Sequence, residues 1–510
     1  MEINTSEVLL GKSLFAADID KETEKEFALP DYCPDVERII RVDANPYIES
    51  ASCAGGRCTV EGKMIFSVLY ESDLKNRLSF ATFSADISEK TDIPDQTRGE
   101  CRASASAAVK RIGCRLLSPR KLLVRARSVL SVAVKSETPV SIIDASALPE
   151  NVFALPAKCE YDRLTDPFVR EYRFSEAVTM NENTPPVEEA VMTCVNLHRP
   201  EYSQSDDGVT VKTTAHYRLL YADPDGEYRM FSHDFPITML VEDMVLPDGA
   251  TLDITATVTE AETSTDIDPY GENRVLNAAF TVMLHGVRHD RVICDCASDA
   301  FISGCENTLE KQTMATLAAG EKYARVFPEE RTFPAAEPEF KEIIDCSARV
   351  TESDLETGED GLYLTGSYVA TVLGRTEQGW DSADYNGSFR EKLTSETPVY
   401  DTRNIDICAF ECSATVLPDG STAVRIMFAA AVTLYSEKKF EAVTRLTGEK
   451  PATSQEAALT LIYCYPASGD TLWSIAKKYC VSPDGLRTDN PSSFADDGTA
   501  STGRPVLVKK

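Results

Sequence analysis

The sequence predicts a mainly β protein: three tandem antiparallel β-sandwich-like repeats of about 150 residues each, with short helices, followed by a small βααβ domain. Two observations predict the repeats. Polar and apolar residues alternate with period two over long stretches, and similar blocks recur three times in one order. A third observation, a strand–turn–helix pattern near the end, predicts the small domain. The predicted domains cover residues 5–140, 160–297, 305–445 and 461–508.

Two recurrent blocks open each repeat. The first is a short acidic segment that enters a strand or helix, at residues 36–40, 187–191 and 340–344. The second is a strand pattern that begins 22 residues later in every repeat, at residues 58–70, 209–221 and 362–374. An identical offset in three places indicates that one unit has been duplicated.

A closing strand pattern ends each repeat, at residues 121–134, 274–287 and 422–435. Another alternating strand precedes it, at residues 101–110, 251–262 and 406–417. Residues 246–249 and 417–420 both read Leu-Pro-Asp-Gly, which is a turn sequence. The period of about 152 residues suits whole domains rather than the short units of a solenoid.

Connecting segments are expected between the repeats. Residues 144–157 and 447–456 are polar or contain proline, which favours connectors. Residues 298–325 predict a helix between the second and third repeats, because Leu309, Met314 and Leu317 follow a spaced apolar pattern. A short helix is also expected to cover one edge of each repeat.

The charge distribution excludes several partners. The chain of 510 residues carries a net charge of −30, while residues 461–510 hold six Lys or Arg and five Asp. The preceding residues therefore carry −31, which repels nucleic acid and anionic lipid. No run of eighteen apolar residues occurs, so no membrane insertion is expected. The first residues resemble no secretory signal, so synthesis in the cytosol is expected.

The 15 cysteines are scattered and form no C-x-x-C pair. In a cytosolic protein most of them are expected to be reduced, buried and apolar in character. A disulfide between Cys464 and Cys480 is an alternative within the last domain, and the compartment argues against it.

The last domain has a local pattern of its own. Residues 461–465 favour a strand, and Ser468-Gly469-Asp470 interrupts it with turn-forming residues. An apolar helical stripe follows, made by Leu472, Ile475, Ala476 and Tyr479. A second helix is expected from Ser482 and Pro483 to Asn490-Pro491, before a strand at 505–508.

These residues closely resemble a LysM module. The matching positions are Gly469, Asp470, Thr471, Leu472, Trp473, Ile475, Ala476, Lys478, Tyr479, Val481, Ser482, Leu486, Asn490, Pro491, Gly503 and Leu507. The resemblance implies binding of an N-acetylglucosamine-containing glycan or of a partner through two loops. The implied binding residues are Gly469, Asp470, Thr471 and Leu472 in the first loop, and Asn490 and Pro491 in the second. Two features depart from the family pattern: Cys480 replaces a frequent helix-ending Gly, and segment 492–502 is longer and more acidic, which could reshape the groove.

The first repeat begins with Ala-Leu-Pro-Asp-Tyr-Cys-Pro-Asp-Val at residues 28–36, which looks like the opening of a SPOCS module. The corresponding residues 185–187 and 338–340 match it more loosely. Tandem SPOCS units with a terminal LysM resemble the SipL-like spore-coat morphogenetic proteins. That resemblance implies a non-enzymatic scaffold, made in the mother cell, that gathers at the forespore surface. It also implies that the LysM domain contacts the ATPase of the coat's basement layer, alongside other coat proteins.

The sequence contains no phosphate-binding loop, metalloprotease motif, nucleophile elbow or dinucleotide fingerprint. One potential metal-ligand set is His285, His289, Cys294 and Cys296. On a strand the two histidines lie about 13 Å apart, too far for one ion, so an ordinary strand end is preferred and no metal or cofactor is expected. Trp473 is expected to pack in the core of its own domain rather than to stack on a sugar.

The leading hypothesis is therefore a structural adaptor that acts by holding partners together, with several weak contacts combining. The alternative is a peptidoglycan-binding protein of the cell wall or spore cortex. A wall hydrolase targeted by a LysM domain is a third possibility. No catalytic residue is predicted.

Overall fold

The computed structural model describes residues 4–74, 77–93, 100–165, 167–449 and 460–509. These residues form 22 strands and two short helices, and all strand pairs in the sheets are antiparallel. The prediction of a mainly β protein with antiparallel sheets is confirmed.

The strands fall into three consecutive groups. The N-terminal group contains β1 (Thr5–Ala28), β2 (Val36–Ala54), β3 (Arg57–Ser72), β4 (Arg77–Asp92), β5 (Glu100–Ser118) and β6 (Lys121–Ile143). The middle group contains β7 (Val152–Leu164), β8 (Phe168–Thr179), β9 (Glu189–Leu197), β10 (Glu201–Ser205), β11 (Gly208–Ala222), β12 (Tyr228–Glu242), β13 (Thr251–Ile267) and β14 (Asn273–Ile302). The C-terminal group contains β15 (Glu306–Phe333), β16 (Glu342–Gly358), β17 (Gly361–Thr376), β18 (Gly379–Thr394), β19 (Thr402–Val416) and β20 (Thr422–Glu449).

The sheet order of the N-terminal group recurs in the other two. Its sheets have the orders β1-β6-β5 and β2-β3-β4, and the C-terminal group repeats them as β15-β20-β19 and β16-β17-β18. In the middle group, β7 and β8 both pair with β14 where the other groups use one long strand. The middle group also adds the short strand β10 on β11. In each group the two sheets face each other through β2 and β5, β9 and β13, or β16 and β19.

Period-two alternation explains the strands. Along β6, buried residues such as Leu122, Val124 and Ala126 alternate with exposed or half-buried ones, so one face of the sheet supplies the core. The two Leu-Pro-Asp-Gly segments form turns, in which Gly249 and Gly420 have φ values of 79° and 81°. Such left-handed angles favour glycine.

The helix predicted at residues 298–325 is wrong, because these residues form the end of β14 and the beginning of β15. A β-bulge between Glu310 and Lys311 shifts the register, so Leu309 and Met314 both point inward although they are five residues apart. That interruption produced the helix-like spacing. In the described part of the three groups there is no helix at all, so the short covering helices are also wrong.

The connectors are shorter than expected. Strand β7 begins at Val152, within the predicted connector 144–157. Strand β20 continues to Glu449, and the remainder of the predicted connector 447–456 lies outside the described residues.

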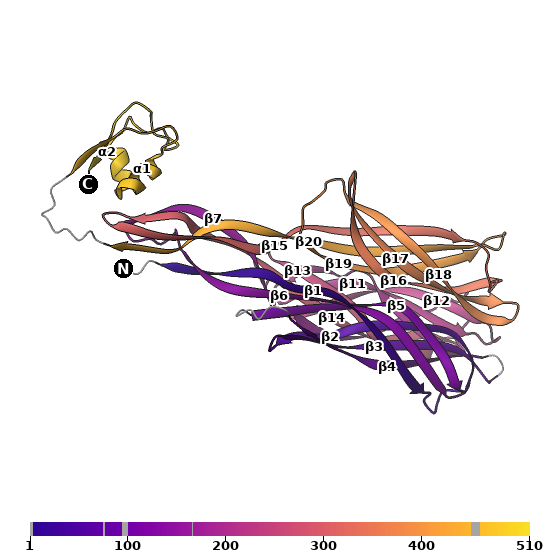
Figure 1. The fold of residues 1–510 in the computed structure, drawn as a ribbon. Coiled ribbons are helices and arrows are strands. Elements are labelled where there is room, and N and C mark those ends of the chain that lie inside the picture. The colour runs from indigo at the N-terminus through magenta and orange to yellow at the C-terminus, as the bar shows by residue number, and fades with distance from the viewer. Residues whose placement is uncertain (1–3, 75–76, 94–99, 166, 450–459, 510) are drawn as a thin grey trace.

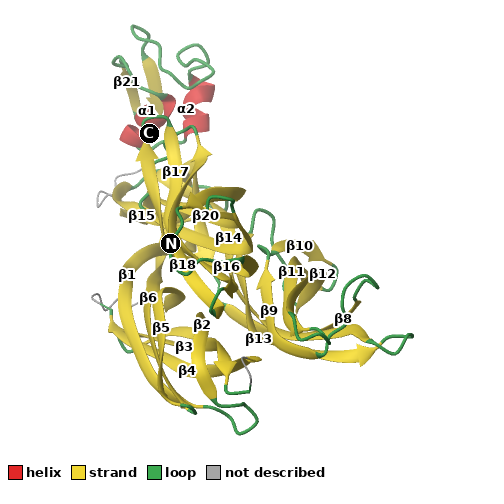
Figure 2. Cartoon of the chain, turned by 90° about the vertical axis from the view of Figure 1, so that its right-hand side faces the viewer, coloured by secondary structure: helices red, strands yellow, loops and turns green. Residues whose placement is uncertain are grey.

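The three groups lie side by side around one common long axis (Figures 1 and 2). The long strands β1, β6, β7, β14, β15 and β20 run toward one end, and the C-terminal module (residues 461–509) lies beyond that end (Figure 1). A shared core between the long strands contains residues of all three groups: Val8, Ile142, Cys159, Tyr161, Cys296, Met314 and Ala442. A second shared core, near the other end, includes Ile40, Leu69, Met192, Leu220, Leu373 and Trp380.

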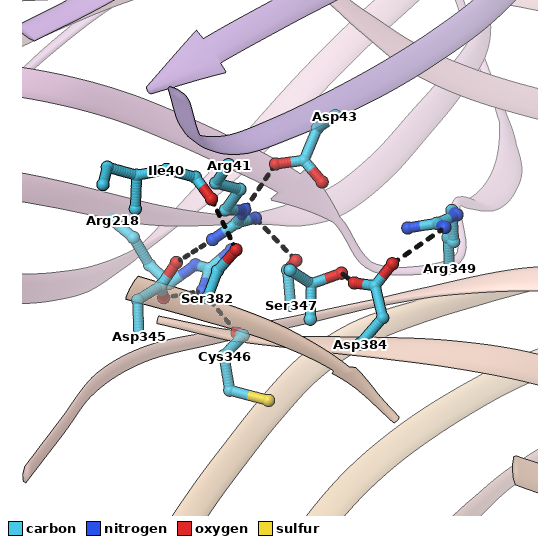
Figure 3. A network of polar contacts seen from close by, with 11 residues as sticks. Ile40, Arg41, Asp43, Arg218, Asp345, Cys346, Ser347, Arg349, Ser382 and Asp384 are labelled. Carbon is cyan, nitrogen blue, oxygen red and sulfur yellow. Dashed lines mark hydrogen bonds and ion pairs between the residues drawn. The ribbon is translucent and has the colours of Figure 1, made fainter. Parts of the chain in front are cut away.

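A buried charge cluster joins the three groups beside this second shared core (Figure 3). Arg41 of β2 lies 2.7 Å from Asp345 of β16 and 2.6 Å from Asp43. Arg218 of β11 contacts the other oxygen of Asp345 and donates to the carbonyl of Cys346 at 2.8 Å. Burial raises the pKa of the Asp345 carboxyl, but the two arginines outweigh it and lower that pKa overall. One carboxylate thus bridges arginines from two other groups.

Candidate functional site

The C-terminal module contains β21 (Leu461–Cys464), α1 (Leu472–Tyr479), α2 (Pro483–Asp489) and β22 (Val506–Lys509). Strand β21 pairs with β22. Thr471 caps α1 by accepting a hydrogen bond from the backbone of Ser474, whose side chain bonds back to Thr471. Ser482 caps α2, with Pro483 in the first turn. The module core contains Cys464, Ile475, Ala476, Leu486, Ala500, Val506 and Val508.

The first predicted binding loop is tied to the long segment 492–502. Gly469 has φ 94° and lies in the turn before α1. The carbonyl of Asp470 accepts from the N–H of Ala500 at 2.9 Å, and the N–H of Leu472 donates to the carbonyl of Gly498 at 2.8 Å. Backbone groups of two of the implied binding residues, Asp470 and Leu472, are therefore already hydrogen-bonded to the chain itself. Segment 492–502 thus pairs with this loop.

The second predicted loop is also used internally. Asn490 is 7% exposed, and its amide nitrogen donates to the carbonyls of Leu486 and Leu507 at 2.9 and 2.8 Å. Its amide oxygen accepts from the N–H of Leu507 at 2.7 Å. The side chain thus joins the end of α2 to β22, while Pro491 is exposed. The N–H of Ser493 donates to the carbonyl of Asn490 at 3.1 Å, so segment 492–502, which also bonds to the first loop, connects the two predicted loops.

The first helix of the module contacts the tip of the β14–β15 hairpin. The ring of Trp473 packs edge-on against Phe301, with 5.1 Å between the ring centres, and its N–H donates to Asp299 at 2.9 Å. Lys477 lies 2.5 Å from the same carboxylate. Burial raises the pKa of Asp299, but the bonds from Lys477 and Trp473 lower it overall. Trp473 was expected inside the module core; it also anchors the module to the body.

Cys480 ends α1 in the left-handed conformation, with φ 54° and ψ 46°. A non-glycine residue there is strained. Its carbonyl accepts from the N–H of Gly304 at 2.9 Å, and its sulfur contacts Asn307 at 3.4 Å, so the strained position forms part of the contact with the hairpin. Both Cys464 and Cys480 are free thiols.

An apolar ridge lies on the outer face of the module's sheet. Leu461, Tyr463 and Tyr465 are 56%, 65% and 71% exposed, and they alternate along the chain with residues that face the core. Leu507 pairs with Tyr463 in register and lies on the same face. This outer ridge was not predicted, although the alternation Leu-x-Tyr-x-Tyr in the sequence indicates one exposed face.

The potential metal ligands of β14 do not converge. His289 lies 3.0 Å from the carboxylate of Asp253, and Cys294 is paired in register with Cys159. Cys296 is fully buried in the shared core. Within the described residues, no three His, Cys, Asp or Glu side chains form a metal-binding group.

A cavity of about 1960 Å³ lies between the three groups. Its walls carry both charge signs, and several of the charges are paired, as Lys110 is with Glu352 at 2.9 Å. Asp406 faces this cavity, and burial raises its pKa to about 6. A proton acceptor alone does not make a hydrolase, which needs a second group placed across the scissile bond. Asp253, whose negative charge also raises the pKa of Asp406, is already held by His289.

Part of the N-terminal group matches a known family. Residues 35–117 match the family model described as SipL, SPOCS domain. This range covers β2, β3, β4 and nearly all of β5. No curated protein and no solved structure matches the chain. Among the described residues, no helix has the length and apolar character needed to cross a membrane.

Proposed function

We propose that this protein is a non-enzymatic structural adaptor in spore coat assembly. The observation that carries the proposal is the match of residues 35–117 to the SPOCS domain. The recurrence of one sheet order in three groups supports extending that assignment to the whole body. On this basis residues 5–140, 160–297 and 305–445 are three SPOCS-like repeats, and residues 461–508 are a LysM domain.

The adaptor works in the mother cell, where it tethers coat material to the forespore surface. Its partners are the ATPase of the coat's basement layer and other coat proteins, which the module recruits. The module suits this role because it lies at one end of the long body and carries the exposed ridge of Leu461, Tyr463 and Tyr465 (Figure 1). Exposed aromatic residues are typical of protein interfaces.

A protein partner is favoured over a glycan for the module. The amide of Asn490 and the backbone groups of Asp470 and Leu472 are engaged in bonds within the module. A glycan recognised by these groups would have to break those bonds, whereas a protein could dock on the outer ridge without breaking any. The glycan-binding alternative therefore relies on groups that are already hydrogen-bonded within the module.

The test is localisation of the full chain in sporulating cells. A fluorescent fusion should surround the forespore, and the Tyr463→Ser/Tyr465→Ser variant should become diffuse at equal abundance. Tyr270, which is 76% exposed on the body, supplies the matched control Tyr270→Ser, which should localise normally. Normal localisation of the double variant would contradict the ridge as the recruiting surface.

Two assays separate the competing functions. Sedimentation of the purified chain with insoluble peptidoglycan tests the glycan alternative, and binding that survives loss of both tyrosines would support it. Zymography in a gel that contains murein tests for hydrolysis. A clear lytic band at the mass of the chain would contradict a non-enzymatic role.

A further inference from the structure

Two thiols of the C-terminal group are in direct contact. Cys346 lies on β16 and Cys412 on β19, 66 residues apart, and their sulfur atoms are 2.7 Å apart. These strands belong to different sheets, so the contact crosses the core between them. The sulfurs lie within about 0.7 Å of the disulfide bond length of about 2.05 Å.

The two thiols differ in access. Cys346 is 3% exposed and belongs to the core between the two sheets. Cys412 packs against that core but is only half-buried. The hydrogen bond with Cys412, together with burial, raises the pKa of the Cys346 thiol. A reagent from solution therefore meets Cys412 first, while Cys346 is placed to react only with its neighbour.

We propose that Cys346 and Cys412 are a site of reversible disulfide formation, with a low-molecular-weight disulfide as the oxidant. The Cys412 thiolate attacks one sulfur of the oxidant, which forms a mixed disulfide and expels one thiolate. The Cys346 thiol then attacks the Cys412 sulfur, and its proton passes to the second thiolate as that group departs as a free thiol. The oxidant gains two electrons, and the two cysteines lose them as the new bond forms.

Other cysteine pairs are less well placed. Cys53 lies opposite Cys58, and Cys159 lies opposite Cys294, on neighbouring strands of one sheet. Residues directly opposite in antiparallel strands have Cβ atoms about 4.5–5.5 Å apart, whereas a disulfide prefers about 3.5–4.5 Å. Bonds at these pairs would strain the ladder, so the inter-sheet pair should react in preference to them.

The bond would join the two sheets beside the buried charge cluster. Cys346 follows Asp345 in β16, and its carbonyl accepts from Arg218 of the middle group at 2.8 Å. Linking β16 to β19 would thus restrain the strand that carries Asp345, the carboxylate shared by the two arginines of the buried charge cluster. Closing a long loop also stabilises the fold by restricting the unfolded chain.

The experiment uses the full chain, purified reduced and then exposed to glutathione disulfide. Acid stops the exchange reaction. The chain is then unfolded at neutral pH in the presence of N-ethylmaleimide, which blocks the remaining free thiols, and its peptides are mapped by mass spectrometry. We expect one linked pair, Cys346 with Cys412, two fewer of the 15 thiols, and a higher melting temperature than the reduced chain. The Cys412→Ser variant should lose both the link and the thermal shift.

Two further variants make the test decisive. Cys346→Ser should stop the reaction at the first step and retain a glutathione adduct on Cys412. Cys408→Ser, on the same strand, is the matched control and should keep the link. Two outcomes would overturn the proposal. One is a link at Cys53–Cys58 or Cys159–Cys294 while Cys346 remains a free thiol that N-ethylmaleimide alkylates. The other is the absence of a glutathione adduct on Cys412 in the Cys346→Ser variant.

Discussion

The buried charge cluster of Arg41, Arg218 and Asp345 is tested by the variant Asp345→Asn. The side chains of Arg41 and Asp345 are each 3% exposed, and that of Arg218 is 9% exposed, so little solvent is available to replace the lost charge. Removing one partner of a buried ion pair typically costs about 3–5 kcal/mol, because the remaining charge stays buried. Here two arginines lose their shared carboxylate. We therefore expect the free energy of unfolding to fall by about 3–5 kcal/mol.

The assay is urea unfolding followed by tryptophan fluorescence. The chain has two tryptophans, and Trp380 belongs to the shared core near this cluster. A Trp473→Phe background therefore reports the three-group contact alone. Because the pKa of Asp345 is lowered in the folded state, its stabilising contribution is present above its unfolded pKa. That contribution is lost as the pH falls through the folded value, so the difference in unfolding free energy between the native chain and the Asp345→Asn variant should shrink only in acid.

Asp384→Asn is the control for this prediction. Its carboxylate lies in the same region, 3.9 Å from Arg349, but it is 52% exposed (Figure 3). Exposed ion pairs contribute about 0–1 kcal/mol, so this variant should lose no more than that. The reasoning is refuted if Asp345→Asn is as mild as the control.

Three further variants test other contacts. Asp406→Asn should stabilise the protein at pH 7.5 by at most about 3 kcal/mol, and not at pH 3.5. Because its pKa is raised to about 6 in the folded chain, the carboxyl opposes folding more and more as the pH rises from its ordinary pKa of about 4 to 6, and by a constant amount above 6. Urea unfolding curves in which the variant and the native chain coincide at both pH values would contradict this. Trp473→Ala should speed limited proteolysis between the module and the body, because the contact with Phe301 is lost. Lys478→Ala is the control and should not change the cleavage rate. Equal cleavage rates for the two variants would argue against Trp473 as an anchor. Cys480→Gly should raise the melting temperature of the module, since relief of left-handed strain is worth about 1 kcal/mol, and a lower value would mean that the sulfur contact matters more.

Local patterns in the sequence predicted most of the strands. The three blocks at residues 58–70, 209–221 and 362–374 lie within β3, β11 and β17, because half-buried strands leave a period-two signal. The pattern failed at residues 298–325, where a bulge in β15 changed the period. Bulges depend on the partner strand, which no single stretch of sequence specifies.

The contacts between distant segments could not be predicted from the sequence. Arg41, Arg218 and Asp345 each look like ordinary strand residues, and nothing local indicates that they meet. The predicted loop residues lie before α1 and at the end of α2, and the sequence did not indicate how they are bonded. Asn490 became a structural bridge, and segment 492–502 took the backbone groups of Asp470 and Leu472.

The side-by-side packing of the groups must overcome their charge, because the residues before 461 carry a net −31. Opposite charges meet at several contacts between groups: Arg77 with Glu189, Lys110 with Glu352, Arg375 with Glu227 and Lys438 with Glu160. All of these pairs are substantially exposed, so each contributes no more than about 1 kcal/mol. The two shared apolar cores, in contrast, bury side chains from every group. Apolar burial therefore supplies the energy of association, and the exposed pairs select the register in which the acidic groups can meet.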